Sequence, residues 1–193
     1  MEVVLVRHGE TEWSRSGQHT GRTDVPLTEA GIRNAELLAP RLERRRFEAV
    51  FTSPLSRASE TCRLAGLGEK AQVREELLEW DYGEYEGITT PEIREGRPGW
   101  LLWRDGCPGG EDARQVGSRA DRLIDEVRHL GGDAALFAHG HVLRVIAARW
   151  VGLPPEAGGL LALSTGTVSV LGYEREVAVI RLWNDGSHLS EQV

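Results

Sequence analysis

The sequence contains little sulfur and no long apolar segment. Its two cysteines, Cys62 and Cys107, lie 45 positions apart, which fits neither a metal site nor a redox motif and is typical of a protein in the reducing cytoplasm. No apolar run reaches membrane-spanning length, and the N-terminus lacks the basic and then apolar pattern of a signal peptide. We therefore expect a cytoplasmic protein that does not bind a membrane.

The chain also lacks an excess of positive charge. Its formal net charge of −7 argues against a nucleic-acid binder. Lys70 is the only lysine among 23 basic residues, so an arginine is informative here only through its position. With 193 residues, the chain is long enough for one buried core and too short for two, so we expect a single domain over residues 1–193. The oligomeric state stays open, a homo-oligomer included.

Apolar segments alternate with helical patterns along the chain. Strands are expected at 2–6, 49–53 and 133–138. Helices are expected at 28–45, 112–130 and 142–151, the first of them kinked or broken by Pro40. Another helix is expected to begin at Pro54, with Ser53 as its N-cap. A hairpin is expected from residue 167 onward. This alternation predicts an α/β fold, a three-layer α/β/α sandwich with a mostly parallel central sheet. Between 75 and 111 the pattern lapses, which indicates a helical or loop insertion, a lid over the rim of the sheet.

Three expected strands end at residues that can bind an anion. The first runs into Arg7 and His8, the second leads to Arg57 one turn into the next helix, and the third ends at His139. In a parallel sheet these ends would meet at one rim, together with two helix N-termini. Two guanidiniums and two imidazoles at such a rim favour a compact anion with several oxygens, of which phosphate is the obvious candidate.

A histidine surrounded by arginines tends to stay neutral, as a nucleophile must. Its ring nitrogen can attack phosphorus while the cations stabilise the charge on the phosphate oxygens. The residues leave the nucleophile open between His8 and His139, with His8 favoured because it lies directly beside Arg7. The proton for the leaving oxygen would come from the stretch 75–87, where six acids lie among aromatic residues, and spacing does not select one of the six.

Five segments of the chain resemble the motifs of the histidine phosphatases, the superfamily of the cofactor-dependent phosphoglycerate mutases. In the order of that family they are RHGET (7–11), TGRTDVPLTEAG (20–31), TSPLSRASET (52–61), LLEWDYGEYEG (77–87) and FAHGHVLR (137–144). The resemblance implies that His8 is the phosphorylated nucleophile, that Arg7, Arg57 and His139 surround the phosphate, and that Glu79 is the proton donor. It implies no metal and no other cofactor, and it makes a small phosphorylated metabolite the expected partner.

Further residues are candidates for substrate binding. Ser14 stands where the family often has an asparagine that contacts phosphate, which puts that contact in doubt. Thr20 and Gly21 match a motif that lies near the substrate in the family, and Gly140 follows His139 at the start of a helix. Arg104, in the insertion, is the candidate for a second anionic group of the substrate, although a surface position is commoner for an arginine.

The segments 13–24, 79–87 and 100–111 look closer to a phosphatase branch with sugar-bisphosphate phosphatases and acid-phosphatase-like members than to the glycolytic mutases. The main hypothesis is a phosphomonoesterase that hydrolyses a small phosphorylated metabolite, with a sugar phosphate or bisphosphate as a candidate. A mutase-type phosphotransferase would use the same residues, and a non-catalytic binder of phosphorylated ligands would have little reason to retain all five catalytic candidates. A metal-dependent hydrolase is disfavoured, because His139 and His141 diverge at a helix start and His141 is expected to cap or pack.

Overall fold

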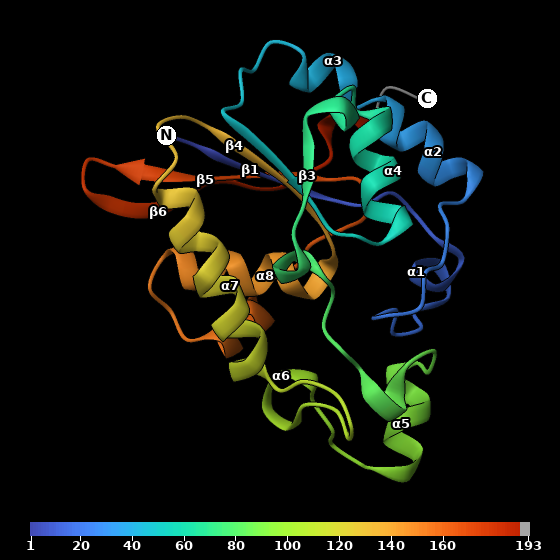
Figure 1. The fold of residues 1–193 in the computed structure, drawn as a ribbon. Coiled ribbons are helices and arrows are strands. Elements are labelled where there is room, and N and C mark those ends of the chain that lie inside the picture. The colour runs from blue at the N-terminus through green and yellow to red at the C-terminus, as the bar shows by residue number, and fades with distance from the viewer. Residues whose placement is uncertain (190–193) are drawn as a thin grey trace.

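A six-stranded sheet with helices on both faces forms the centre of the computed structural model, which describes residues 1–189 (Figure 1). The strands are β1 (Val3–Arg7), β2 (Ala49–Thr52), β3 (Ala71–Val73), β4 (Ala134–Ala138), β5 (Val168–Glu174) and β6 (Val177–Asp185). Their order in the sheet is β3-β2-β4-β1-β5-β6. The first four strands are parallel. Strand β5 runs antiparallel to β1 and pairs antiparallel with β6, with which it forms the expected hairpin.

The helices cover both faces of this sheet. They are α1 (Glu12–Ser16), α2 (Glu29–Glu36), α3 (Ala39–Leu42), α4 (Ser56–Leu64), α5 (Thr90–Gly96), α6 (Leu102–Asp105), α7 (Ala113–Arg128) and α8 (Gly140–Trp150). Successive side chains of β1 point to opposite faces: Val3 and Leu5 pack in the core under α7 and α8, and Val4 and Val6 pack in the core under α3 and α4. The predicted three-layer α/β/α arrangement is therefore confirmed.

Two expected helices differ from the structure at their ends. The helix expected over 28–45 is divided into α2 and α3, because Pro40 lies in the first turn of α3 and cannot continue a preceding helix. The expectation that Ser53 caps the next helix is wrong, since α4 begins at Ser56 and Leu55 holds the N-cap position without a side-chain cap. The Ser53 hydroxyl instead contacts His139 at 2.8 Å, a partner from a distant part of the chain.

The register of the central strands brings three carboxyl ends to one edge of the sheet. Strand β4 lies between β1 and β2, and Ala138 pairs with Arg7 while Phe137 pairs with Thr52. The ladder continues one residue further, because the amide of His8 donates to the carbonyl of Ala138 at 2.9 Å. The strand ends therefore meet at one rim, as predicted from the sequence.

The segment between residues 75 and 111 folds over this rim. It contains α5, α6 and the two short 3₁₀ helices η2 (Glu75–Leu77) and η3 (Gly83–Tyr85), and its Trp80, Tyr82 and Trp100 are buried. Gly83 has a φ of +52°, and a Cβ there would meet the carbonyl oxygen of Pro108 at 2.2 Å, so only glycine fits this approach of two backbone segments. Along residues 1–189, none of the helices combines the length and the apolar character that crossing a membrane requires.

The remaining short 3₁₀ helices lie outside this segment. They are η1 (Gly68–Lys70), η4 (Pro155–Leu160) and η5 (Ser187–Leu189). Of these, η4 packs closely against α8, and through that contact it supports one wall of the rim.

Candidate active site

A cavity of about 260 Å³ opens at the rim where the parallel strands end. Its lining residues are Arg7, His8, Ser14, Gly17, Gln18, His19, Thr20, Glu79, Tyr82, Thr90, Gly140, His141 and Arg144. The carboxyl end of β1, the loop before Gly21, the segment 79–90 and the start of α8 each contribute to it. Parallel α/β sheets bind their ligands at this position.

His8 follows β1, is buried and lines the cavity. Its Nδ1 lies 2.7 Å from the carbonyl oxygen of Gly9. A carbonyl oxygen only accepts, so Nδ1 carries the proton and Nε2 carries the lone pair. Among the described residues, Nε2 of His8 has no hydrogen-bond partner. Burial, together with the positive charges of Arg7 and Arg57, holds the pKa of His8 well below its usual value of 6.5.

His139 follows β4, and its ring centroid lies 5.2 Å from that of His8. The Nε–H of Arg57 donates to its Nδ1 at 3.1 Å. Because a guanidinium only donates, Nε2 of His139 carries the proton and donates to the Ser53 hydroxyl at 2.8 Å. Both ring nitrogens of His139 are therefore occupied. Burial and the charge of Arg57 hold its pKa well below the usual value.

The two arginines of the predicted phosphate site have different surroundings. Arg57 is fully buried and also donates to the backbone carbonyls of Thr20, Gly21 and Thr23 at 2.9 to 3.1 Å, so it lies beside the cavity rather than on its wall. Arg7 lines the cavity, and its Nη1 donates to the carbonyl oxygen of Leu163. The Nε–H of Arg7 is buried and has no acceptor within residues 1–189, and leaving a buried donor unpaired costs free energy that an anion in the cavity would offset.

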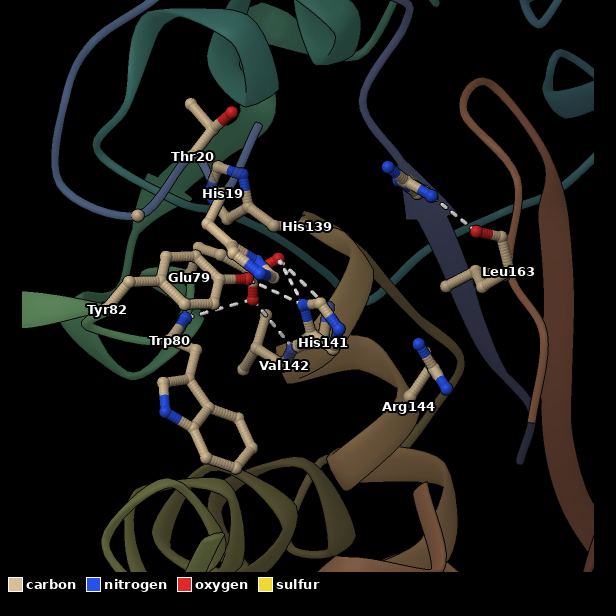
Figure 2. A network of polar contacts seen from close by, with 12 residues as sticks. His19, Thr20, Glu79, Trp80, Tyr82, His139, His141, Val142, Arg144 and Leu163 are labelled. Atoms are coloured by element: carbon tan, nitrogen blue, oxygen red, sulfur yellow. Dashed lines mark hydrogen bonds and ion pairs between the residues drawn. The ribbon is translucent and has the colours of Figure 1, made fainter. Parts of the chain in front are cut away.

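Glu79 is buried on the wall of the cavity, at the N-terminus of α8 (Figure 2). One carboxylate oxygen accepts from the amides of Trp80 and Val142 at 3.0 and 2.9 Å, and the other accepts from the amide of His141 at 2.9 Å. The amides of His141 and Val142 belong to the first turn of α8, so the carboxylate takes two helix donors that would otherwise lack a partner. These bonds fix the carboxylate in the cavity.

Sequence reasoning missed several residues that line the cavity. His141, expected to cap or pack, lines the cavity with its ring, and its Nδ1 lies 2.6 Å from the hydroxyl of Tyr82. The ring of His19 lies 4.7 Å from that of Tyr82 between centroids, and Arg144 lies on the same wall as His141. One signal was present in the sequence: Arg144 comes three residues after His141, so both occupy the same face of a helix that begins at the rim.

The structure separates the five substrate-binding candidates. Ser14, Thr20 and Gly140 line the cavity, although the hydroxyl of Ser14 also closes the capping box at the start of α1. Gly21 does not line it, since its amide donates to the carboxylate of Glu86 at 2.9 Å and its carbonyl accepts from Arg57. Arg104, the candidate for a second anionic group, does not line the cavity: its exposed guanidinium binds the carboxylate of Asp105 and the carbonyl of Gly99.

The cavity thus combines a buried neutral imidazole, a guanidinium N–H without an acceptor among residues 1–189, and a carboxyl group fixed by three backbone hydrogen bonds. This set can bind a phosphate, attack its phosphorus and exchange a proton with the leaving oxygen. Among residues 1–189, no group of three or more histidine, cysteine or acidic side chains has the arrangement of a metal site.

Known proteins share this fold and these motifs. A family model for the histidine phosphatase superfamily (branch 1) matches residues 3–186. An acid phosphatase from Mycobacterium tuberculosis is 43% identical, over 93% of this chain and 92% of that protein. A sedoheptulose 1,7-bisphosphatase from Saccharomyces cerevisiae is 39% identical, over 78% of this chain and 67% of the relative. A solved structure of a protein from Mycobacterium tuberculosis superposes with a TM-score of 0.90 at 41% identity, covering 95% of this chain and 96% of the other. The chain therefore belongs to branch 1 of the histidine phosphatase superfamily and is a phosphomonoesterase of that family.

Proposed function

We propose that this enzyme hydrolyses the phosphate esters of small metabolites through a phosphohistidine on His8, with Glu79 as the proton carrier. The main support for this proposal is the position of the ring proton on His8 and on His139. The Nε2 lone pair of His8 faces the cavity without a partner among the described residues, whereas both nitrogens of His139 are already bonded to Arg57 and Ser53. This difference supports His8 as the nucleophile over His139.

In the first step, Nε2 of His8 forms a bond to phosphorus, and the bond from phosphorus to the ester oxygen breaks. Glu79, which enters this step protonated, gives its proton to that oxygen and becomes a carboxylate, so the alcohol leaves neutral. The Nε–H of Arg7 binds a phosphate oxygen. The positive charge of the buried Arg57, which also lowers the pKa of His8, stabilises the negative charge on the phosphate oxygens. The hydrogen bond from Nδ1 to the Gly9 carbonyl supports the positive charge that the ring gains on phosphorylation.

In the second step, water attacks the phosphorus of phospho-His8. Glu79, now a carboxylate, takes a proton from the water, and the nitrogen–phosphorus bond breaks to return the lone pair to Nε2. Phosphate leaves, and both side chains regain their initial protonation. No metal or other cofactor enters the proposed steps.

The names of the relatives support a class of substrates. One relative is an acid phosphatase, and another is a phosphatase for a sugar bisphosphate, so we place a sugar phosphate or bisphosphate first among the candidates. Both cysteines are free and buried, which fits the cytoplasmic location expected from the sequence.

A phosphate-release screen over a panel of phosphorylated metabolites, with His8→Ala as the blank, tests the proposal. We expect the wild-type enzyme to release phosphate and to carry an acid-labile, base-stable phosphate when quenched in alkali, and His8→Ala to do neither. Covalent phosphate with these properties on His8→Ala would contradict the proposal.

The same preparation separates hydrolysis from mutase chemistry, since a mutase would use the same side chains but protect phospho-His8 from water. The rate of phosphate release is compared with the interconversion of 2- and 3-phosphoglycerate. We expect hydrolysis to be the faster reaction, and a faster interconversion would replace the phosphatase proposal with a phosphotransferase.

A further inference from the structure

The cavity contains more positive and hydrogen-bond-donating groups than one phosphate needs. Two arginines and three histidines line it, and among the described lining residues Glu79 is the only acid. The carboxylate oxygens of Glu79 already accept three backbone hydrogen bonds. His141 lies beside the proposed proton donor, since its Nδ1 is 3.9 Å from a carboxylate oxygen of Glu79. The proposed steps on phosphorus give no role to the side chains of His19, His141 and Arg144.

His141 presents a defined hydrogen-bond donor to the cavity. The Tyr82 hydroxyl lies 2.6 Å from Nδ1 of His141 and has no other hydrogen-bond partner among the described residues, so we assign its hydrogen to this contact, with the hydroxyl as donor. Nδ1 is then the acceptor, and Nε2 carries the hydrogen. Because the ring of His141 lines the cavity, this N–H is a donor available to a bound molecule.

Arg144 is held in place while part of its guanidinium stays unpaired. Its Nε donates to the carbonyl of Gly158 at 3.0 Å, its Nη2 donates to the carbonyl of Gly159 at 3.2 Å, and the group lies 4.6 Å from the ring centre of Trp103. Within the part of the chain that the structure describes, Nη1 has no acceptor. The guanidinium is therefore ordered before a ligand arrives, which lowers the entropy cost of binding an anion.

The two side chains act from the same helix. They lie three residues apart on α8, one turn along the same face, and both line the cavity. Burial and the nearby positive charge of Arg144 hold the pKa of His141 well below 6.5, so the ring contributes a neutral donor next to a cation. A donor and a cation one turn apart match the oxygens of a phosphate or a carboxylate.

We propose that His141 and Arg144 form a subsite for a second anionic group, a phosphate or carboxylate, on a substrate whose reacting phosphate lies at His8. The proposal rests on the proposed function, because the reacting phosphate fixes where the rest of the substrate lies. It moves to Arg144 the role that the sequence suggested for Arg104, whose guanidinium lies on the surface and is paired with Asp105.

Three matched substrates test this subsite: 4-hydroxybutyl phosphate, 1,4-butanediol bisphosphate and 4-phosphooxybutanoate. The measured quantity is the ratio of kcat/KM for each doubly anionic substrate to kcat/KM for the hydroxyl compound. We expect the wild-type enzyme to favour the doubly anionic substrates and Arg144→Gln to lower the ratio about tenfold or more. The control Arg104→Gln should keep the wild-type ratio. A fall for the bisphosphate alone identifies the second group as phosphate, and a fall for the carboxylate alone identifies it as carboxylate.

A wild-type ratio near one, or an unchanged ratio in Arg144→Gln, would overturn the subsite while phosphate release continued to support the proposed function. Absence of hydrolysis of all three compounds and of the metabolite panel would instead overturn the proposed function. If Arg144→Gln fails to fold because the Gly158 and Gly159 carbonyls lose their donor, Tyr82→Phe provides the test of the subsite instead. It keeps the ring but removes the proton that orients His141, so the ratio should fall, and an unchanged ratio would then reject the subsite.

Discussion

The guanidinium of Arg119 and the carboxylate of Glu111 form a bidentate pair, with nitrogen–oxygen distances of 2.9 and 3.0 Å. The same guanidinium donates to the backbone carbonyls of Glu76, Leu78 and Glu79 at 2.6 to 3.1 Å. Both side chains are largely buried, outside the cavity. Through this pair, α7 holds the backbone that carries the proposed proton donor, so Arg119 is a positioning residue for Glu79.

Arg119→Lys should lower kcat about tenfold for alkyl phosphates and much less for aryl phosphates, with little change in KM. A lysine has three donors and cannot reproduce the five bonds of the guanidinium, so Glu79 loses its fixed position. Alkyl alcohols need the proton from Glu79 to leave, whereas phenolates do not. Steady-state kinetics on both classes measures the effect.

Arg122→Lys is the matched control, since Arg122 lies on the same helix and pairs with Glu76 at the surface. It should leave both rates unchanged. An equal loss for alkyl and aryl phosphates in Arg119→Lys would indicate a general structural role instead of a positioning role.

Glu79→Gln should slow alkyl phosphate hydrolysis by about 10²- to 10⁴-fold, the usual contribution of a general acid. With p-nitrophenyl phosphate, phosphorylation of His8 should remain fast, because nitrophenolate leaves without a proton. The second step still needs a base, so rapid mixing should show a burst of one nitrophenolate per active site and accumulated phosphohistidine. Glu84→Gln, at an exposed acid of the same stretch, should behave like the wild type. A similar loss for both substrates, without a burst, would assign the proton to another carboxylate.

Acid should destabilise the fold below about pH 6.5. Burial holds the pKa values of His8, His139 and His141 well below 6.5 in the folded state, so the unfolded chain binds protons that the folded chain does not. Each such histidine lowers the free energy of unfolding by about 1.4 kcal/mol per pH unit, hence about 4 kcal/mol for three, as pH falls from 6.5 towards the folded pKa values.

Urea unfolding between pH 7.5 and 5 measures this slope. His141→Gln should reduce this slope by about 1.4 kcal/mol per pH unit, and replacement of the exposed His129 by glutamine should not change the contribution of the three buried rings. A free energy of unfolding that stays constant over this range would show that the three rings accept protons without unfolding.

Gly31→Ala should destabilise the protein by about 1 to 3 kcal/mol, the usual cost of overpacking, although alanine normally favours a helix. A Cβ on Gly31 would meet the carbonyl oxygen of Glu10 at 2.2 Å, and one on Gly9 would meet the carbonyl oxygen of Gly31 at 2.4 Å. The backbone after His8 thus lies directly against the start of α2. Gly96→Ala, in α5 with open space around it, is the control and should be neutral or stabilising. Equal thermal unfolding midpoints for the two variants would contradict this packing.

The meeting of the strand ends could be predicted because it depends on a general rule. Buried strands joined by helices are parallel, and parallel strands end at the same edge, which places Arg7, His8 and His139 together. The spacing of apolar residues in the sequence could not predict the antiparallel pairing of β5 with β1 or the short and largely exposed strand β3. Neither feature depends on the periodicity of apolar residues.

The roles of Arg104 and Arg144 could not be predicted for a different reason. Arg104 lies in α6, a short helix within the segment where the sequence pattern lapses, and its partners Asp105 and the carbonyl of Gly99 depend on the local fold. Arg144 lies inside a regular helix, and nothing in the sequence distinguishes it from the many arginines on the surface. The cap expected of Ser53 was wrong for a similar reason, since its hydroxyl bonds to His139, 86 residues away in the chain.

The central place of β1 has a consequence for motion. This strand is bonded on both sides, and its side chains reach both cores, so the amide of His8 at its end should exchange its hydrogen only when the whole protein unfolds. Thr90 also lines the cavity and begins α5, a short helix with Ile93 as its buried residue. We therefore expect the amides of α5 to exchange through local opening, well before the amide of His8, which is held in the ladder of the sheet.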